Sequence, residues 1–222
     1  MNSEMFMLYS LMVFLALAPV LRAGPWPRAP GEQFTSITVE APTSATAVNQ
    51  VYGALYFERG LPREWTLGLD SGADGLGYQK SYAFLRRPFF SGRSSRAAIE
   101  LGVGYQSSAR GHGFAIRPAL TWGRGLEVVN KPGWLTLDGS AAHIPFLETT
   151  IFKIEATAGL SWTDAFKTFL QATYEQETGR PAFSSITPSA AVQVSDSFHL
   201  IGGVILSKEQ KTKVKFGVWM SF

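Results

Sequence analysis

Charged side chains recur at alternate positions in several short segments of this chain. In the segment FKIEATAGLSW, Lys153 and Glu155 lie on either side of Ile154, and in RAAIELGVGY Glu100 separates two apolar residues. Alternate residues of a β-strand point to opposite faces, so these segments place charges on one face and apolar side chains on the other. Opposite charges on a shared face can form ion pairs or attract charged solutes. This polar face is therefore the candidate functional site.

The polar face carries nearly equal numbers of acids and bases. Alternation predicts two cross-strand pairs, with Glu100 opposite Arg117 and Asp138 opposite Lys153, the second across a turn at Pro145-Phe146. Arg87 is also assigned to this face, although it can exchange facing with Arg86. The other charges assigned to the face are Glu58, Asp70, Glu155, Glu175, Lys167, Lys213 and Lys215.

Catalytic and metal-binding patterns are sparse. A serine nucleophile needs a histidine base within hydrogen-bond reach, and of the three histidines (His112, His143 and His199) only His143 has a serine nearby, Ser140. We expect no catalytic residues, no metal site and no cofactor. The segment GLDSGADGLG (68–77) is compatible with a weak calcium site, but a glycine-rich turn is the simpler interpretation.

The charged positions fall in about twelve alternating segments separated by Gly, Pro, Asp, Ser and Asn clusters. Each is roughly 9 to 12 residues long, the length that a tilted strand needs to cross a bilayer. The predicted strands are 33–41, 50–59, 64–71, 79–88, 95–106, 113–123, 133–143, 149–162, 165–176, 183–195, 197–207 and 211–222.

Composition and the amino terminus restrict the classes further. The 222 residues suffice for one all-β domain, cysteine is absent, and a net charge of +3 is too small to indicate nucleic-acid binding. Residues 5–21 form an uncharged apolar run followed by Ala23, which predicts a cleaved signal peptide over 1–23. A single membrane-spanning helix is the alternative, for which this run is short.

The strand pattern fits either a soluble β-sandwich or lipocalin-like barrel, with the apolar faces in a core, or a transmembrane barrel, with the apolar faces in lipid. Aromatic residues near segment ends favour the second, because transmembrane barrels carry aromatic girdles at the membrane interfaces. These residues are Tyr105, Phe114, Trp122, Trp134, Phe152, Trp162, Phe166, Tyr174 and Phe222.

Together, the signal-like leader, the twelve alternating segments and the ending VKFGVWMSF resemble an integral β-barrel of the Gram-negative outer membrane. The resemblance implies an all-β, closed antiparallel barrel over 33–222, preceded by a periplasmic segment over 24–32. It also implies contact with outer-membrane lipids, and recognition by the barrel-assembly machinery of a carboxy-terminal signal formed by Phe216, Val218, Met220 and Phe222. We expect a monomer with both termini on the periplasmic side.

The expected connections between strands are short. Enzymes, receptors and adhesins usually build their sites from longer loops, so short connections argue against these three functions. The predicted function is a small channel or porin-like diffusion pathway with a charge-paired lumen. A structural barrel with an occluded lumen is the alternative, and a lipid-modifying enzyme is a third candidate. The proline-rich segment GPWPRAPGEQ (24–33) is expected either to plug the periplasmic mouth or to lie disordered.

Overall fold

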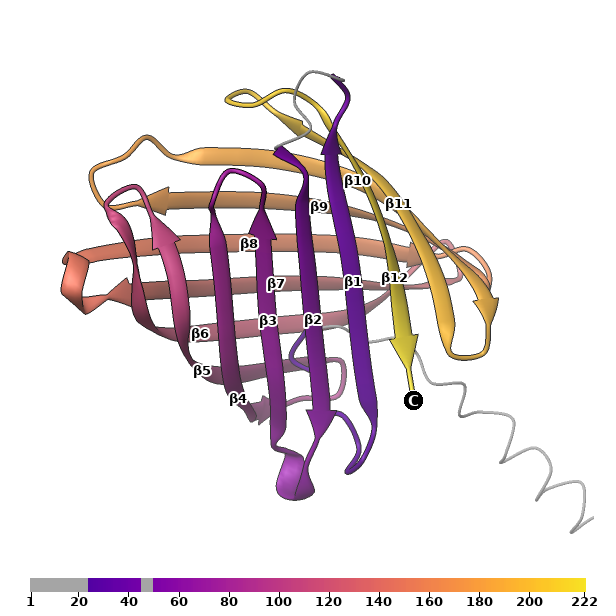
Figure 1. The fold of residues 1–222 in the computed structure, drawn as a ribbon. Coiled ribbons are helices and arrows are strands. Elements are labelled where there is room, and N and C mark those ends of the chain that lie inside the picture. Colours follow the sequence, from indigo (N-terminus) through magenta and orange to yellow (C-terminus); the bar gives the residue numbers. More distant parts are fainter. Residues whose placement is uncertain (1–23, 45–49) are drawn as a thin grey trace, which may run out of the picture.

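The computed structural model describes residues 24–44 and 50–222, which form a closed barrel of twelve antiparallel strands (Figure 1). The predicted signal peptide, and most of the expected loop over 42–49, lie outside these residues. Within these ranges, no helix has the length and apolar character needed to cross a membrane. The strands are β1 (Gln33–Pro42), β2 (Tyr52–Gly60), β3 (Thr66–Asp74), β4 (Gln79–Ser91), β5 (Ser95–Ser108), β6 (Gly111–Val128), β7 (Lys131–Ile144), β8 (Thr149–Ser161), β9 (Phe166–Glu177), β10 (Phe183–Ser195), β11 (Phe198–Ser207) and β12 (Lys213–Ser221).

The last strand closes the barrel against the first. β1 and β12 pair antiparallel from Phe34 opposite Ser221 to Pro42 opposite Lys213. Beyond the strands, Gln33 N donates to Phe222 O at 2.9 Å and Phe222 N donates to Gln33 O at 3.0 Å. Closure pairs the backbone N–H and C=O groups of both terminal strands. Unpaired backbone groups are costly in a membrane, because lipid offers them no hydrogen-bond partner. The predicted all-β, closed, twelve-strand architecture is confirmed.

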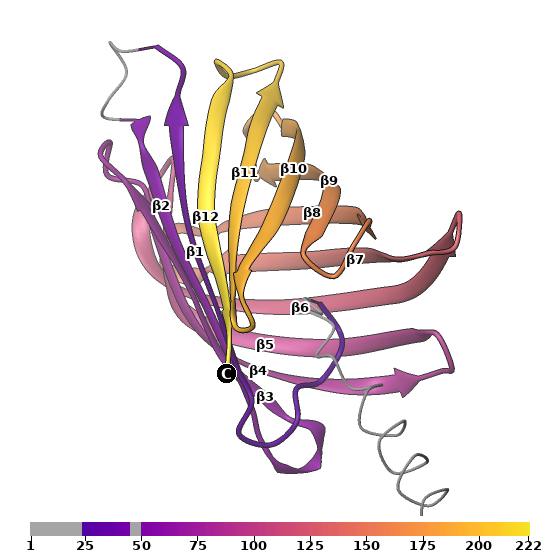
Figure 2. The same ribbon diagram turned by 90° about the vertical axis from the view of Figure 1, so that its right-hand side faces the viewer.

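The strands run steeply inclined to one another around the barrel (Figures 1 and 2). We call the end where β1 begins and β12 finishes the N/C end, and the opposite end the loop end. Apart from the β1–β2 connection, the connections between strands contain two to five residues. Two short 3-10 turns, Pro62–Glu64 and Pro145–Leu147, lie in these connections.

The β6–β7 hairpin is longer than the sequence predicts. Its strands were expected to end at 123 and start at 133, but pairing continues to a two-residue turn at Val129 and Asn130. Both residues have positive φ angles, 51° and 56°. This backbone matches the right-handed twist of a two-residue hairpin, so the strands continue to its tip.

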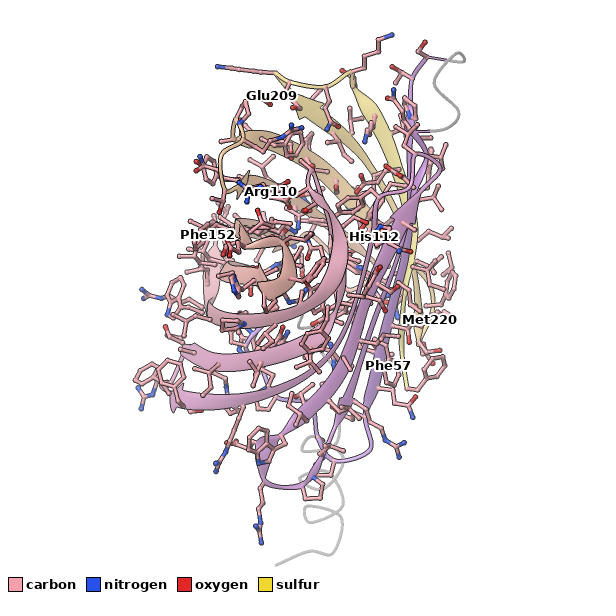
Figure 3. The ribbon with its side chains drawn as sticks, turned by 60° about the vertical axis from the view of Figure 1, so that its left-hand side comes forward. Phe57, Arg110, His112, Phe152, Glu209 and Met220 are labelled. Atoms are coloured by element: carbon pink, nitrogen blue, oxygen red, sulfur yellow. The ribbon has the colours of Figure 1, made fainter. Side chains whose placement is uncertain are left out.

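Side chains alternate between an apolar outer face and a mixed inner face. Ile99, Leu101 and Val103 of β5 are exposed on the outside, whereas Glu100 between them is buried in the lumen. Figure 3 shows Phe57 and Met220 on the outer surface and Glu209 at the loop end. The outer face has the apolar character of a lipid-facing surface.

Eight of the nine aromatic residues assigned to membrane interfaces lie on this outer face. Trp134 is the exception, because it shares the inward parity of Thr136 and Asp138 and lines the lumen. The prediction for Trp134 was therefore wrong, since position near a strand end does not override the period-two alternation.

The seam where β12 pairs with β1 contains a glycine, Gly217, at a position where the neighbouring strand leaves no space for a side chain. A Cβ at Gly217 would lie 2.6 Å from the carbonyl oxygen of Ile37 on β1, whereas a Cβ at Gly202 on the adjacent β11 meets nothing within 4 Å. We expect Gly217→Val to cost about 1–3 kcal/mol by overpacking the seam, and Gly202→Val to cost much less. The measurement is the temperature at which the folded, fast-migrating band disappears on detergent gels. Equal temperatures for the two variants would contradict the seam's role.

Candidate functional site

Apart from Arg87, the structure places the charged residues proposed for the lumen on the inner face, eleven in number. Six of them take part in ion pairs, and the other five lie along the β7–β12 side of the barrel. The paired residues are Glu58, Asp70, Glu100, Arg117, Lys153 and Glu155, and the others are Asp138, Lys167, Glu175, Lys213 and Lys215.

A chain of alternating charges covers the β2–β6 wall. Arg86 donates to Glu58 at 2.5 Å and to Glu100 at 2.7 Å. Arg117 in turn donates to Glu100 at 3.0 Å and to Asp70 at 2.5 Å. Each arginine therefore links two acids, and Glu100 contacts both arginines, which compensates for the removal of these charges from bulk water.

Two further bases terminate this chain. Arg28, which precedes β1, donates to Glu58 Oε2 at 2.7 Å, and the Lys80 ammonium lies 2.8 Å from an oxygen of Asp70. Tyr56 Oη donates to Glu58 at 2.5 Å and accepts from Arg86 at 2.8 Å. We call these seven residues the charge chain, in spatial order Arg28, Glu58, Arg86, Glu100, Arg117, Asp70 and Lys80.

The register of β5 and β6 differs from the predicted one by two residues. Glu100 lies opposite Ala119, and Arg117 lies opposite Gly102, because the β5–β6 turn is formed by 109–110. The predicted ion pair between Glu100 and Arg117 is present, but it is diagonal. Gly102 leaves its lumen position without a side chain, and a Cβ there would already contact Arg117 at 3.5 Å.

Arg86, and not Arg87, faces the lumen. Arg86 lies opposite Thr66 on β3 and Glu100 on β5, and all three side chains point inward. Arg87 points outward, and its guanidinium lies 5.3 Å from the centroid of the Trp65 ring. Arg28 and Lys80 are two further bases in the lumen that the strand pattern did not predict. Parity with Tyr82 and Arg86 along β4 identifies Lys80, whereas no strand pattern covers Arg28.

The predicted pair between Asp138 and Lys153 is wrong. Asp138 lies opposite Glu155, and Lys153 lies opposite Ser140, because the β7–β8 connection contains the turn Pro145–Leu147 and a left-handed Glu148. Lys153 instead lies 2.8 Å from Glu155 on its own strand. A connection longer by two residues shifts each partner by one lumen position without changing facing.

The β7–β12 wall carries charges that lack a carboxylate or ammonium partner. Among the described residues, Asp138, Lys167, Glu175, Lys213 and Lys215 form no ion pair within 4.0 Å. Lys167 donates to the backbone oxygen of Asp164 at 2.8 Å. The two walls of the lumen therefore differ: one is ion-paired throughout, and the other combines the Lys153–Glu155 pair with five charges that form no ion pair.

Six aromatic side chains form a continuous series of ring contacts around the inside of the barrel, which we call the aromatic belt. Phe169 stacks on Trp219 with centroids 5.3 Å apart, and Tyr56 stacks on Phe84 at 5.7 Å. Contacts of 6.4 to 6.5 Å join the remaining neighbours, within the range of favourable ring packing. In spatial order the belt is Trp134, Phe169, Trp219, Phe34, Tyr56 and Phe84.

A cavity of about 380 Å³ lies inside the barrel between the charge chain and the β7–β12 wall. Its lining includes Gly24, five rings of the belt and several hydroxyl side chains. Six basic side chains line it against four acidic ones. The basic set is Lys80, Arg86, Arg117, Lys153, Lys167 and Lys215, and the acidic set is Asp70, Glu100, Asp138 and Glu155.

The one retained serine–histidine candidate does not assemble. Ser140 faces the lumen, whereas His143 faces outward and its Nδ1 lies 3.0 Å from Thr150 Oγ1. The two acids of the possible calcium site in 68–77 already have other partners. Asp70 belongs to the charge chain, and Asp74 accepts hydrogen bonds from two backbone amides of the β3–β4 turn. In 24–44 and 50–222, no three His, Cys, Asp or Glu side chains gather closely enough to hold a metal ion.

Comparison with known proteins shows likeness in fold alone. No family model and no curated protein matches the sequence. Among solved structures, the KdgM porin superposes with a TM-score of 0.62 at 10% identity, covering 85% of this chain and 99% of that porin. The NanC porin gives 0.60 at 6% identity, covering 85% and 98%, and an outer-membrane channel from Pseudomonas putida F1 gives 0.51 at 11%, covering 91% and 100%.

The chain has the fold of outer-membrane porins. This confirms the resemblance to outer-membrane barrels at the level of architecture. At identities of 6–11%, the lumen side chains of those proteins do not transfer to this chain, so its site has to be interpreted from its own residues.

The charge chain predicts a large difference between two adjacent arginines. Arg86→Met leaves Glu58 and Glu100 buried with one base fewer each, and we expect a loss of about 3–5 kcal/mol in the free energy of unfolding. Arg87→Met, on the outer face, is the matched control and should cost less than about 1 kcal/mol. Urea titration of both variants in lipid vesicles measures the difference. Similar losses would contradict the asymmetry.

Proposed function

We propose that this protein is an outer-membrane channel for the passive diffusion of small solutes. The proposal rests on the porin fold, the apolar outer face and the polar cavity within the lumen. In this assignment the N/C end faces the periplasm, and the short loops face outward. The protein functions as a monomer in contact with outer-membrane lipids.

The observation that carries the proposal is the set of unpaired charges on the β7–β12 wall of the cavity. A lumen meant only for structure would pair its charges, as the β2–β6 wall does. On the β7–β12 wall, Lys167 and Lys215 line the cavity without an ion-pair partner, against one such acid, Asp138. Fixed charges along a pore select solutes by sign, and this excess favours anions.

A non-conducting structural barrel is the second candidate. It is favoured by the charge chain and the aromatic belt, which together occupy much of the lumen surface. A lipid-modifying enzyme has less support, because Ser140 and His143 lie on opposite faces of β7. Two porins and an outer-membrane channel are among the solved structures with a similar fold.

The final strand supports the proposal that its last residues are the assembly signal. Phe216 and Phe222 are 62% and 69% exposed on the outer side, so both rings are available to a partner during insertion. We expect Phe222→Ala to lower the outer-membrane yield several-fold while leaving the stability of refolded barrel nearly unchanged, because the backbone bonds to Gln33 remain. Quantitative blotting of membrane fractions tests this, with Val129→Ala, at an exposed residue of the β6–β7 turn, as control. Unchanged yield would refute the signal.

Solute flux tests the channel itself. We expect liposomes containing refolded protein to swell in small neutral and anionic solutes, with faster swelling in an organic anion than in a neutral solute of equal size. Lys215→Glu should reduce this ratio at least about twofold, because it reverses one cavity charge. Lys211→Glu, in the β11–β12 loop, is the control and should leave the ratio unchanged. Absence of swelling with folded protein would refute the channel and favour the structural barrel.

A further inference from the structure

The segment before β1 folds back into the barrel. Glu32 N donates to Ala29 O at 3.0 Å, closing a turn with Pro30 and Gly31 at its centre, and Gly31 has φ +93°. Proline followed by a residue with positive φ is the signature of a type II turn. Gly31 N also donates to Gly60 O at 2.9 Å, which anchors the turn to the end of β2. Figure 2 shows the chain running from this turn into the barrel toward β6.

Inside the barrel this segment contacts three strands of the β2–β6 wall. Arg28 pairs with Glu58 of β2, and Arg86 of β4 donates to the Gly24 carbonyl at 3.2 Å. Pro25 is fully buried. At the β6 edge of this wall, a Cβ at Gly123 would lie 2.6 Å from the Trp26 ring and 2.8 Å from Pro25. The absence of a side chain at Gly123 therefore provides the space that these two residues occupy.

The segment fills the interruption in the aromatic belt. The ring contacts run from Trp134 on β7 the long way round to Phe84 on β4 and leave β5 and β6 uncovered. Arg86 lies over the Phe84 ring at 5.1 Å and holds Gly24. A Cβ at Gly24 would in turn lie 3.0 Å from Thr136, two residues from Trp134. Residues 24–28 thus complete a ring around the lumen.

The segment is suited to lie in a lumen without joining the sheet. Pro25, Pro27 and Pro30 supply no backbone N–H, so three donors that a strand would otherwise satisfy are absent. Trp26 contributes apolar surface at the level of the belt. Apolar constrictions close channels by excluding water, and the belt with Trp26 has this character.

We propose that residues 24–32 are a releasable internal plug that, with the aromatic belt, closes the lumen toward the N/C end. The proposal rests on the channel function proposed above. Release leaves the charge chain paired: when Arg28 departs, Glu58 keeps Arg86 and the Tyr56 hydroxyl as partners. The turn at 29–32 keeps its bonds to β2 and acts as the hinge. Opening is then a displacement of residues 24–28 with the barrel wall unchanged.

The chain contains no cysteine, so a single introduced thiol can report on the plug. Thr136→Cys places a thiol under Gly24, where we expect slow reaction with a small water-soluble methanethiosulfonate. Adding Trp26→Ala and Arg28→Ala should accelerate labelling several-fold. Gly123→Leu, which removes the space for Trp26 from the wall side, is a second release variant. Trp162→Ala, on the outer face, is the control and should change nothing. Gel migration of unboiled samples verifies that each barrel is folded.

Liposome swelling by the same proteins separates the plug from the channel. Faster labelling together with faster swelling in the Trp26→Ala and Arg28→Ala variant supports the plug. Two results overturn the plug. One is labelling of Thr136→Cys that is equally fast with and without these substitutions. The other is faster labelling in the substituted protein when the unsubstituted barrel conducts and both proteins swell liposomes at the same rate. Accelerated labelling without swelling in any variant refutes the channel function and leaves the segment's position in the lumen supported. Unchanged slow labelling in both release variants also overturns the plug.

Discussion

Every second side chain of a closed twelve-strand barrel points into one enclosed space, and the charges placed there have to find partners. The charge chain meets this constraint through Arg86 and Arg117, each of which links two acids. Glu58, only 1% exposed, contacts Arg28, Arg86 and Tyr56. Breaking a buried pair leaves an uncompensated charge, so this network also determines which substitutions the wall tolerates.

The same constraint explains the difference between the two walls. Large side chains on the β2–β6 side lie over small ones on neighbouring strands. A Cβ at Gly68, for example, would lie 2.0 Å from the Phe84 ring. Because its small positions are covered by large side chains and its charges are ion-paired, this wall offers few free groups to a solute. The cavity lies between this wall and the β7–β12 wall, where Lys167 and Lys215 form no ion pair.

Strand number, closure and the facing of the lumen charges are predictable from sequence, because period-two alternation is a local property. Register is less predictable, because it depends on the turn. The β5–β6 and β7–β8 pairings both differ from expectation by two residues, which preserved the ion pair between Glu100 and Arg117 but replaced that between Asp138 and Lys153. The inward facing of Trp134 follows from its parity with Asp138. The ring contacts between Phe169 and Trp219 join strands that are not neighbours, and no local pattern predicts them.

The amino-terminal segment was expected either to plug the barrel mouth or to lie disordered, and the structure places it in the lumen. Its Pro-Gly turn is a local signal, whereas the contact of Trp26 with Gly123 depends on the folded barrel. Fold likeness to porins at 6–11% identity extends to the barrel wall, while the charge chain, the belt and this segment are argued from this chain alone.

We propose that the lumen is a solute pathway and not only a packed interior. Single-channel recording of the refolded protein in planar lipid bilayers tests it most directly. We expect discrete current steps of small amplitude, with a reversal potential on the anion-selective side in a salt gradient. A protein that migrates as a folded barrel on unboiled gels but yields no current steps, with or without the Trp26→Ala and Arg28→Ala substitutions, would contradict it.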